Sequence, residues 1–135
     1  MENVLKQGDM VVMEKFSEIR RFDIVVFPFQ GSDVFYIKRI IGLPGETIRI
    51  DEDGNIYVNG EILEEDYGYE TIVPAMIGRA GEEIKLGEDE YFLMGDNCNN
   101  SEDSRYVNIG NISKKEINGK VVFRISPRSE IGMIK

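Results

Sequence analysis

Short apolar segments separated by turn residues run along nearly the whole chain. Within them, apolar residues either alternate with polar ones or form brief continuous runs, a pattern typical of β-strands rather than helices. The chain is therefore predicted to consist mostly of strands. The segments cover residues 9–16, 23–29, 34–43, 46–51, 55–63, 82–87, 90–96, 119–126 and 130–135.

The connections between these segments contain strong turn signals. They include Pro44-Gly45, Asp53-Gly54 and Asn59-Gly60. Asp-Gly and Asn-Gly favour tight hairpin turns because both central residues need positive φ values. We therefore expect two tight turns around one short strand between residues 51 and 63.

A helix with caps is predicted in one place, residues 111–119. Ser113 is a plausible N-cap, Glu116 its capping-box partner three residues on, and Gly119 a stop. Residues 15–21 are expected to form no more than a short turn. The sequence thus predicts an all-β fold with at most one short helix, a sandwich or barrel, as a single domain over residues 1–135.

Composition narrows the class of protein. Of 135 residues, 41% are hydrophobic and 30% charged, which excludes a disordered chain. The longest apolar runs are far shorter than the ~20 residues of a transmembrane helix. The net charge of −9 repels phosphate backbones, so we expect no nucleic-acid partner.

Two absences restrict the chemistry further. The chain has no histidine, which excludes Ser-His-Asp and Cys-His catalysis and histidine metal sites. Cys98 is its single cysteine, so neither an intrachain disulfide nor a cysteine metal cluster can form.

Lys38 is the first candidate for chemistry, because it lies in a strongly apolar segment. Burial lowers the pKa of a lysine, and a neutral lysine against a hydroxyl is a general base. Alternatively, the strand lies at a sheet edge and Lys38 reaches water. Its neighbour Arg39 cannot lose its proton and needs a carboxylate, a carbonyl cage or a water-exposed end. Alternation places Val34, Tyr36, Lys38 and Ile40 on one face and Phe35, Ile37, Arg39 and Ile41 on the other.

The second candidate is the polar segment 96–105, which follows an apolar strand directly. Its many acceptors suit holding the donors of a cation. A calcium loop of the EF-hand kind is excluded because counting from Asp96 places Cys98 third, Ser101 sixth and Val107 twelfth. Taken alone, the segment is typical of a surface array of Asx-turns.

Together these two segments resemble the type I signal peptidases, membrane-anchored serine proteases that remove signal peptides from exported proteins. The resemblance is carried by "YIKRIIGLPGE" (36–46) and "GDNCNNSEDSR" (95–105), and supported by "DIVVF" (23–27) and, in part, "MENVLKQGDMVVMEK" (1–15). The matching segments span nearly the whole chain and occur in the same order as in the family. It implies a mainly antiparallel β fold.

The resemblance also implies a role for each matching residue. Lys38 would be the general base of a Ser-Lys dyad, Ser101 would orient its amine, and Asp103 would support that region. Arg105 would pair with Asp103 or Asp96, and no metal or cofactor is needed. Met1, Leu5, Tyr36 and Ile37 would line the S1 pocket for small residues, and Val11 and Val26 the S3 pocket.

Two departures from the family pattern matter. The usual Arg-Asp-Asn-Ser is Cys98-Asn99-Asn100-Ser101 here, which suggests altered loop stability more than lost chemistry. The family's nucleophilic serine precedes the methionine that aligns with Met1, so we expect it immediately before this chain, which as written should not hydrolyse peptides. We also expect a missing N-terminal single-pass anchor, with this domain on the extracytoplasmic face of the cell membrane.

The implied substrates are signal peptides of exported preproteins, cut after Ala-x-Ala-like sites. One alternative is a silent homologue that assembles pili or other surface proteins without cutting. The retained Lys38 argues against it. Another alternative is a peptidase with the same fold that cleaves itself, as certain repressors do. The motifs at residues 36–46 and 95–105 fit signal peptidases better.

Overall fold

A computed structural model describes residues 10–14, 18–28, 35–63, 72, 77–95, 103–106, 109–126 and 132–133. All pairings between these strands are antiparallel. The all-β prediction is confirmed, and every predicted segment contains a strand. The strands are β1 (Met10–Glu14), β2 (Ile24–Pro28), β3 (Phe35–Gly42), β4 (Thr47–Ile50), β5 (Ile56–Val58), β6 (Glu61–Ile62), β7 (Ile84–Lys85), β8 (Glu90–Met94), β9 (Ile112–Ser113), β10 (Gly119–Ser126) and β11 (Gly132–Met133).

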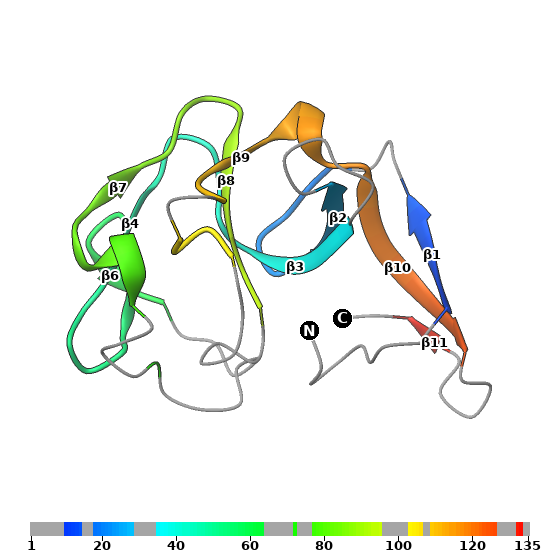
Figure 1. Cartoon of the computed structure of the whole chain (residues 1–135), viewed down its shortest axis with the longest axis horizontal. Helices are drawn as coiled ribbons and strands as arrows, with labels where there is room; N and C mark the ends of the chain where they lie inside the picture. The colour runs from blue at the N-terminus through cyan, green and yellow to red at the C-terminus, as the bar shows by residue number, and fades with distance from the viewer. Residues whose placement is uncertain are drawn as a thin grey trace.

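The strands form two sheets. The larger has seven strands in the order β1-β10-β2-β3-β8-β9, with β11 also paired to β10, and the smaller has the order β6-β5-β4-β7. The small sheet lies at one end of the molecule and the β1, β10 and β11 strands at the other (Figure 1). The chain leaves the large sheet after β3, forms the small sheet, and returns as β8 beside β3.

The two crossings between the sheets lie side by side. The Gly45 N–H donates to the Gly87 carbonyl (3.0 Å), and the Leu86 N–H donates to the Glu46 carbonyl (2.8 Å). Gly45 has a φ of 81° and follows Pro44, which is the signature of a type II turn. The segment 43–46 is therefore held by the returning chain.

The predicted hairpin turn at residues 59–60 is present. Asn59 and Gly60 have φ values of 52° and 82°, and Val58 pairs with Glu61 across the turn. Two positive φ values are what a type I′ turn requires. This turn joins β5 and β6, so the strand predicted over 55–63 is two short strands.

Residues buried on opposite faces of β3 and β8 belong to two different cores. Ile40 and Leu93 pack in one cluster, whereas their neighbours Ile41 and Phe92 pack in the other. These strands are therefore covered on both sides, as expected from their apolar sequences. The first cluster contains Val25, Phe27, Ile40, Tyr91, Leu93 and Ile112. The second includes Ile41, Ile48, Ile50, Ile56, Leu86, Phe92 and Met94.

The helix predicted over residues 111–119 is wrong in extent. Ile112–Ser113 is strand β9, a single 3₁₀ turn, η5, follows at Lys114–Glu116, and Gly119 begins β10 instead of stopping a helix. The Ser113 hydroxyl donates to Glu116 Oε1 (3.0 Å) and does not cap the turn's backbone. The cause is tertiary, because Ile112 is buried where β9 pairs with β8.

A second 3₁₀ turn of the described residues is η3 (Gly78–Gly81), which the sequence did not predict. The described residues contain no α-helix. Within that same part of the chain, no helix has the length and apolar character needed to span a bilayer. Residues 18–20 have no regular structure and 21–22 form a turn, consistent with the prediction; residues 15–17 lie outside the described part.

An ion pair fixes the turn that follows β3. Arg21 donates through Nη1 to Glu46 Oε1 (2.8 Å) and through Nη2 to Glu46 Oε2 (2.6 Å), and Nη1 also donates to the Ile41 carbonyl (2.8 Å). Glu46 Oε1 accepts from the Leu43 N–H (2.6 Å). Burial raises the pKa of the Glu46 carboxyl, but the hydrogen bonds from Arg21 and Leu43, with the charge of Arg21, outweigh it and lower the pKa below its ordinary value.

This lowered pKa predicts an acid-sensitive contribution to stability. The ionised carboxylate favours the folded state, so its stabilisation is complete above an ordinary pKa of 4.5 and is lost as pH falls through the folded value. Urea unfolding at pH 7 and pH 3 should show a smaller acid-induced loss of stability in Glu46→Gln than in the unaltered protein. The exposed Glu82→Gln is the control. Equal losses in Glu46→Gln and the unaltered protein would contradict the assignment.

Candidate functional site

Lys38 lies in the middle of β3, between β2 and β8 in the large sheet. It pairs with Val25 of β2, and two residues on Ile40 pairs with Leu93 of β8. The strand is therefore internal, so the interpretation that placed Lys38 on an edge strand is wrong. Lys38 is half-buried, and its Nζ lies 5.6 Å from the centroid of the Tyr36 ring.

The aromatic surface beneath Lys38 is itself fixed. The Tyr36 ring meets the Phe27 ring edge to face, with centroids 5.9 Å apart. Tyr36 and Ile37 are half-buried like Lys38, whereas Ile40 and Ile41 are buried. Residues 36–38 of β3 are thus partly exposed, and the Lys38 amine lies beside an aromatic ring.

Arg39, the other cation of β3, is fully buried. Its Nη1 donates to the Phe22 carbonyl (2.8 Å), which is one of the solutions the sequence analysis allowed. Phe22 adopts a left-handed backbone conformation, with a φ of 74°, and its N–H donates to the Ile40 carbonyl (2.8 Å). This conformation is uncommon for a residue other than glycine, and here it presents a carbonyl to the guanidinium.

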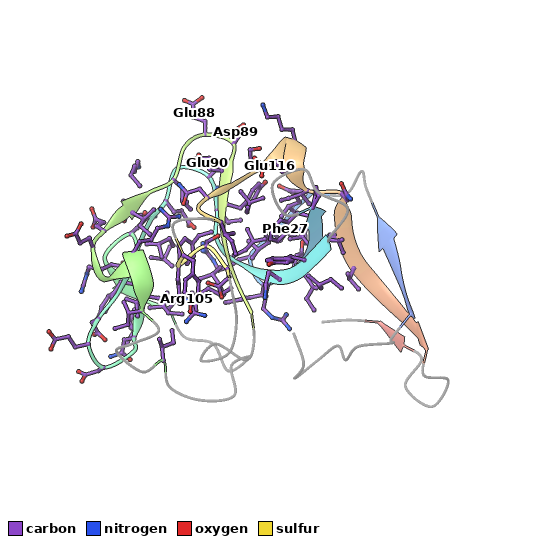
Figure 2. All side chains as sticks on the ribbon, viewed as in Figure 1. Phe27, Glu88, Asp89, Glu90, Arg105 and Glu116 are labelled. Atoms are coloured by element: carbon purple, nitrogen blue, oxygen red, sulfur yellow. The ribbon has the colours of Figure 1, made fainter. Side chains whose placement is uncertain are left out.

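The second cluster of buried polar groups is the turn at residues 103–106. Asp103 and Arg105 are both fully buried (Figure 2 labels Arg105). Arg105 donates through Nε to Asp103 Oδ1 (2.8 Å) and through Nη2 to Oδ2 (2.9 Å). Of the two acids that the sequence analysis offered to Arg105, the structure shows the pair with Asp103; Asp96 lies outside the described residues.

This turn is hydrogen-bonded to β8 and the residue after it. Ser104 Oγ accepts from the Leu93 N–H (2.9 Å), and the Ser104 N–H donates to the Leu93 carbonyl (3.0 Å). Asp103 Oδ2 accepts from the Gly95 N–H (3.1 Å). Because Leu93 pairs with Ile40, the turn lies one strand away from β3.

The turn is also hydrogen-bonded to η3. This 3₁₀ turn belongs to the small-sheet segment, by which we mean the part of the chain from β4 to β7. The Arg79 N–H donates to the Arg105 carbonyl (2.9 Å), and Arg79 Nε donates to the Ser104 carbonyl (2.7 Å). A Cβ on Gly78 would lie 2.3 Å from the Arg105 carbonyl oxygen. Sequence reasoning missed both residues, because a lone arginine between small residues carries no motif.

The predicted pocket residues fall on different parts of the sheet. Val26 and Ile37 pair directly and share one face, which by alternation is opposite to the face of Lys38 and Tyr36. Val11 pairs with Arg124 of β10, whereas Val26 pairs with Gly119 at the start of that strand. Met1, Leu5, Asp96 and Ser101 lie outside the described residues, and so do any contacts that Lys38 makes with them.

Comparison with known proteins identifies relatives over almost the whole chain. Residues 1–126 match the family described as "Signal peptidase, peptidase S26". The chain is 34% identical to a probable signal peptidase I-2 of Synechocystis, over 99% of this chain and 62% of that relative. It is 35% identical to a signal peptidase I of Bacillus licheniformis, over 97% of this chain and 74% of that one. The chain thus spans just under two thirds of the first relative and about three quarters of the second.

The fold is also similar to that of a solved signal peptidase. The crystal structure of a signal peptidase I from Enterococcus faecalis superposes with a TM-score of 0.60 and 32% sequence identity. The match covers 77% of this chain and 97% of the other. Sequence and fold therefore point to the same family.

The buried ion pair gives a prediction for stability. Arg105→Met leaves the Asp103 carboxylate buried without its guanidinium, which should lower the free energy of unfolding by about 3–5 kcal/mol. The control is Arg20→Met, which removes an exposed arginine 3.8 Å from Glu18, a kind of pair worth at most about 1 kcal/mol. Urea unfolding at neutral pH measures both. Similar losses in the two variants would contradict a specific role for the buried pair.

A second prediction concerns the close contact at Gly78. Gly78→Ala places a Cβ against the Arg105 backbone at a φ of +62°, so it combines backbone strain with a clash. It should cost about 2–5 kcal/mol of unfolding free energy, the sum of about 1–2 for the backbone and about 1–3 for the clash. Gly45→Ala, at a φ of +81° with nothing within 4 Å, carries the strain alone and should cost about 1–2 kcal/mol. Thermal or urea unfolding that ranks Gly45→Ala as the more harmful variant would show that the contact yields easily.

Proposed function

This chain belongs to the signal peptidase S26 family of serine endopeptidases, and we propose that it works as a signal peptidase I, which removes signal peptides from exported preproteins after Ala-x-Ala-like sites. One observation carries the proposal: the family match takes in both Lys38 and the Asp103–Arg105 turn. The relatives are named signal peptidases, which favours a protease over a silent assembly factor.

In the proposed reaction Lys38 is the general base. Its neutral amine takes the proton of a serine hydroxyl as the serine oxygen attacks the scissile carbonyl carbon. The tetrahedral intermediate collapses when the Lys38 ammonium gives this proton to the peptide nitrogen, which leaves as the amine of the mature protein, and an acyl-enzyme remains. Lys38, neutral again, takes a proton from the water that attacks the ester carbonyl, and it returns the proton to the serine oxygen as the signal peptide is released with a free carboxylate. The nucleophile is the serine that the family motif places immediately before Met1.

Burial and neighbouring residues support this role for Lys38. The amine lies 5.6 Å from the centroid of the Tyr36 ring, on an internal strand, and Lys38 is half-buried. A substrate that binds along this side in an extended conformation would exclude water from the amine, and desolvation favours its neutral form. Ser101 orients the amine in this proposal, while Asp96, Asp103 and Arg105 maintain the backbone of the loop that carries Ser101.

The oxyanion and the substrate side chains also need partners. Backbone N–H groups at the serine and a neighbouring position stabilise the oxyanion in this proposal. An extended substrate points alternate side chains in opposite directions, so two small pockets can select alanine. We assign S1 to Met1, Leu5, Tyr36 and Ile37 and S3 to Val11 and Val26. The direct pairing of Val26 with Ile37 supports adjacent pockets on that face, whereas Tyr36 faces the other side of β3 and Val11 pairs five residues farther along β10.

We further propose where the reaction takes place. Bacterial signal peptidase I is a membrane-anchored enzyme whose catalytic domain is extracytoplasmic. The parent protein of this chain would carry one N-terminal membrane span that holds the domain at the outer surface of the cell membrane. This location places the site next to signal peptides as they emerge from the bilayer.

The proposal is tested with the chain extended by one serine before Met1. That protein should cleave a fluorogenic peptide containing an Ala-x-Ala site, and Lys38→Met should lower kcat at least about 100-fold because the general base is lost. The control is Lys120→Met. Lys120 of β10 and Lys38 of β3 pair with Val25 of β2 from its two sides, so both lysines lie in the same row of the sheet. Binding without cleavage by the serine-extended protein would favour the silent homologue instead.

A further inference from the structure

Arg79 of η3 contacts the 103–106 turn from the small-sheet segment, while β8 holds the same turn through Leu93. We infer that Arg79 is a positioning residue for catalysis, which fixes the 103–106 turn relative to the strand that carries Lys38. The inference rests on the proposed function, because it concerns the geometry of the Lys38 site. Arg79 lies outside both motifs that carry the family resemblance.

The first observation is that Arg79 is hydrogen-bonded to the turn through both its backbone and its side chain. Its backbone N–H donates to the Arg105 carbonyl (2.9 Å) and its Nε to the Ser104 carbonyl (2.7 Å). Gly78 allows this approach, because any side chain there would collide with the Arg105 carbonyl. Two successive carbonyls of the turn are thus held by one residue.

The second observation is that the Arg79 guanidinium is itself held in place. Nη2 donates to Asn111 Oδ1, and Asn111 Nδ2 donates to Glu90 Oε1 (3.2 Å). That Glu90 oxygen also accepts from the Gly87 N–H (2.8 Å). The guanidinium carbon lies 5.9 Å from the centroid of the buried Phe92 ring. Its orientation is therefore set by groups from three segments of the chain.

The third observation is a short path from this network to Lys38. Ser104 exchanges two hydrogen bonds with the backbone of Leu93, and Leu93 pairs with Ile40 of β3. Lys38 and Ile40 are two residues apart and face the same side of β3. The turn is thus fixed to β8 through Leu93 and to η3 through Arg79, and loss of the Arg79 contacts would let it move relative to the amine.

The chemistry of this position requires an arginine. The planar fork presents Nε and Nη2 to two acceptors at once, the Ser104 carbonyl and the Asn111 side chain. A lysine ammonium is a single point on a flexible stem and fixes neither the angle nor the second acceptor. A displacement of about 1 Å, caused by a substitution away from the reacting atoms, can lower a rate about 100-fold.

The experiment uses the serine-extended protein and compares Arg79→Gln and Arg79→Lys with the control Arg49→Gln. Arg49 also stacks on an aromatic ring of the small-sheet segment, 4.7 Å from the Tyr57 centroid. We expect Arg79→Gln to lower kcat about 10- to 100-fold with little change in KM, and to shift the midpoint of the acid limb of the pH–rate profile. Arg79→Lys should restore part of kcat, and Arg49→Gln should leave both quantities unchanged.

The outcomes separate this inference from the proposed function. If the serine-extended protein cleaves peptides and folded Arg79→Gln matches its kcat and acid limb, the inference is overturned while the protease assignment stands. If Arg79→Gln does not fold, the Arg79→Lys variant provides the test. A reduced kcat with a shifted acid limb in Arg79→Lys supports the inference. An unchanged kcat and pH–rate profile overturn it. A serine-extended protein without activity overturns the proposed function, and with it the catalytic role of Arg79. In that case amide hydrogen exchange at Leu93 and Ser104 still shows whether Arg79 holds the turn.

Discussion

The burial of β3 and β8 on both faces is the constraint on which the rest of this structure depends. Two cores meet along β8 and the second half of β3, so a polar group carried there cannot reach water without leaving its place. Arg39 shows the consequence: its guanidinium is fully buried and takes a carbonyl from Phe22, whose backbone adopts an uncommon conformation. Burial of a guanidinium is unfavourable unless it is hydrogen-bonded. The left-handed backbone at Phe22 directs a carbonyl to Arg39 and supplies one such bond.

The same constraint explains the 103–106 turn. This segment packs on a covered strand and carries two charges, so each charge needs a partner within the turn or close to it. The Asp103 carboxylate accepts two bonds from the Arg105 side chain as well as bonds from the backbone of Arg105 and Gly95. Such a set of bonds adds less to stability than its number suggests, because desolvation opposes it. Its bonds to the backbone N–H groups of Gly95 and Arg105 also favour one arrangement of the turn.

The strands and hairpin turns followed from the sequence because their causes are local. Alternation of apolar residues and glycine at positive φ act within a few residues, so β3 and the Asn59-Gly60 turn were predicted correctly. Ser113 shows where local signals fail. Its sequence context predicts a helix cap, but Ile112 is buried where β9 pairs with β8, so Ser113 lies in a strand. The hydrogen bonds of Arg79 with the 103–106 turn join residues 25 or more positions apart through backbone carbonyls, and a carbonyl has no signature in a sequence. The motif resemblance identified Lys38 and the 103–105 segment, but it did not indicate what holds them together.

The paired crossings between the two sheets have an evolutionary consequence. Because the chain leaves β3 and returns to β8 at neighbouring points, with Gly45 bonded to Gly87 and Glu46 to Leu86, the segment between them is an insertion with closed ends. Residues added to its loops leave the pairing of β3 with β8 in place, provided that Ile48, Ile50 and Leu86 keep their packing in the core shared with Ile41 and Phe92. The exception is η3, which contacts the 103–106 turn. Insertions in this family should therefore be tolerated most readily before η3, and the length between η3 and β8 should vary least.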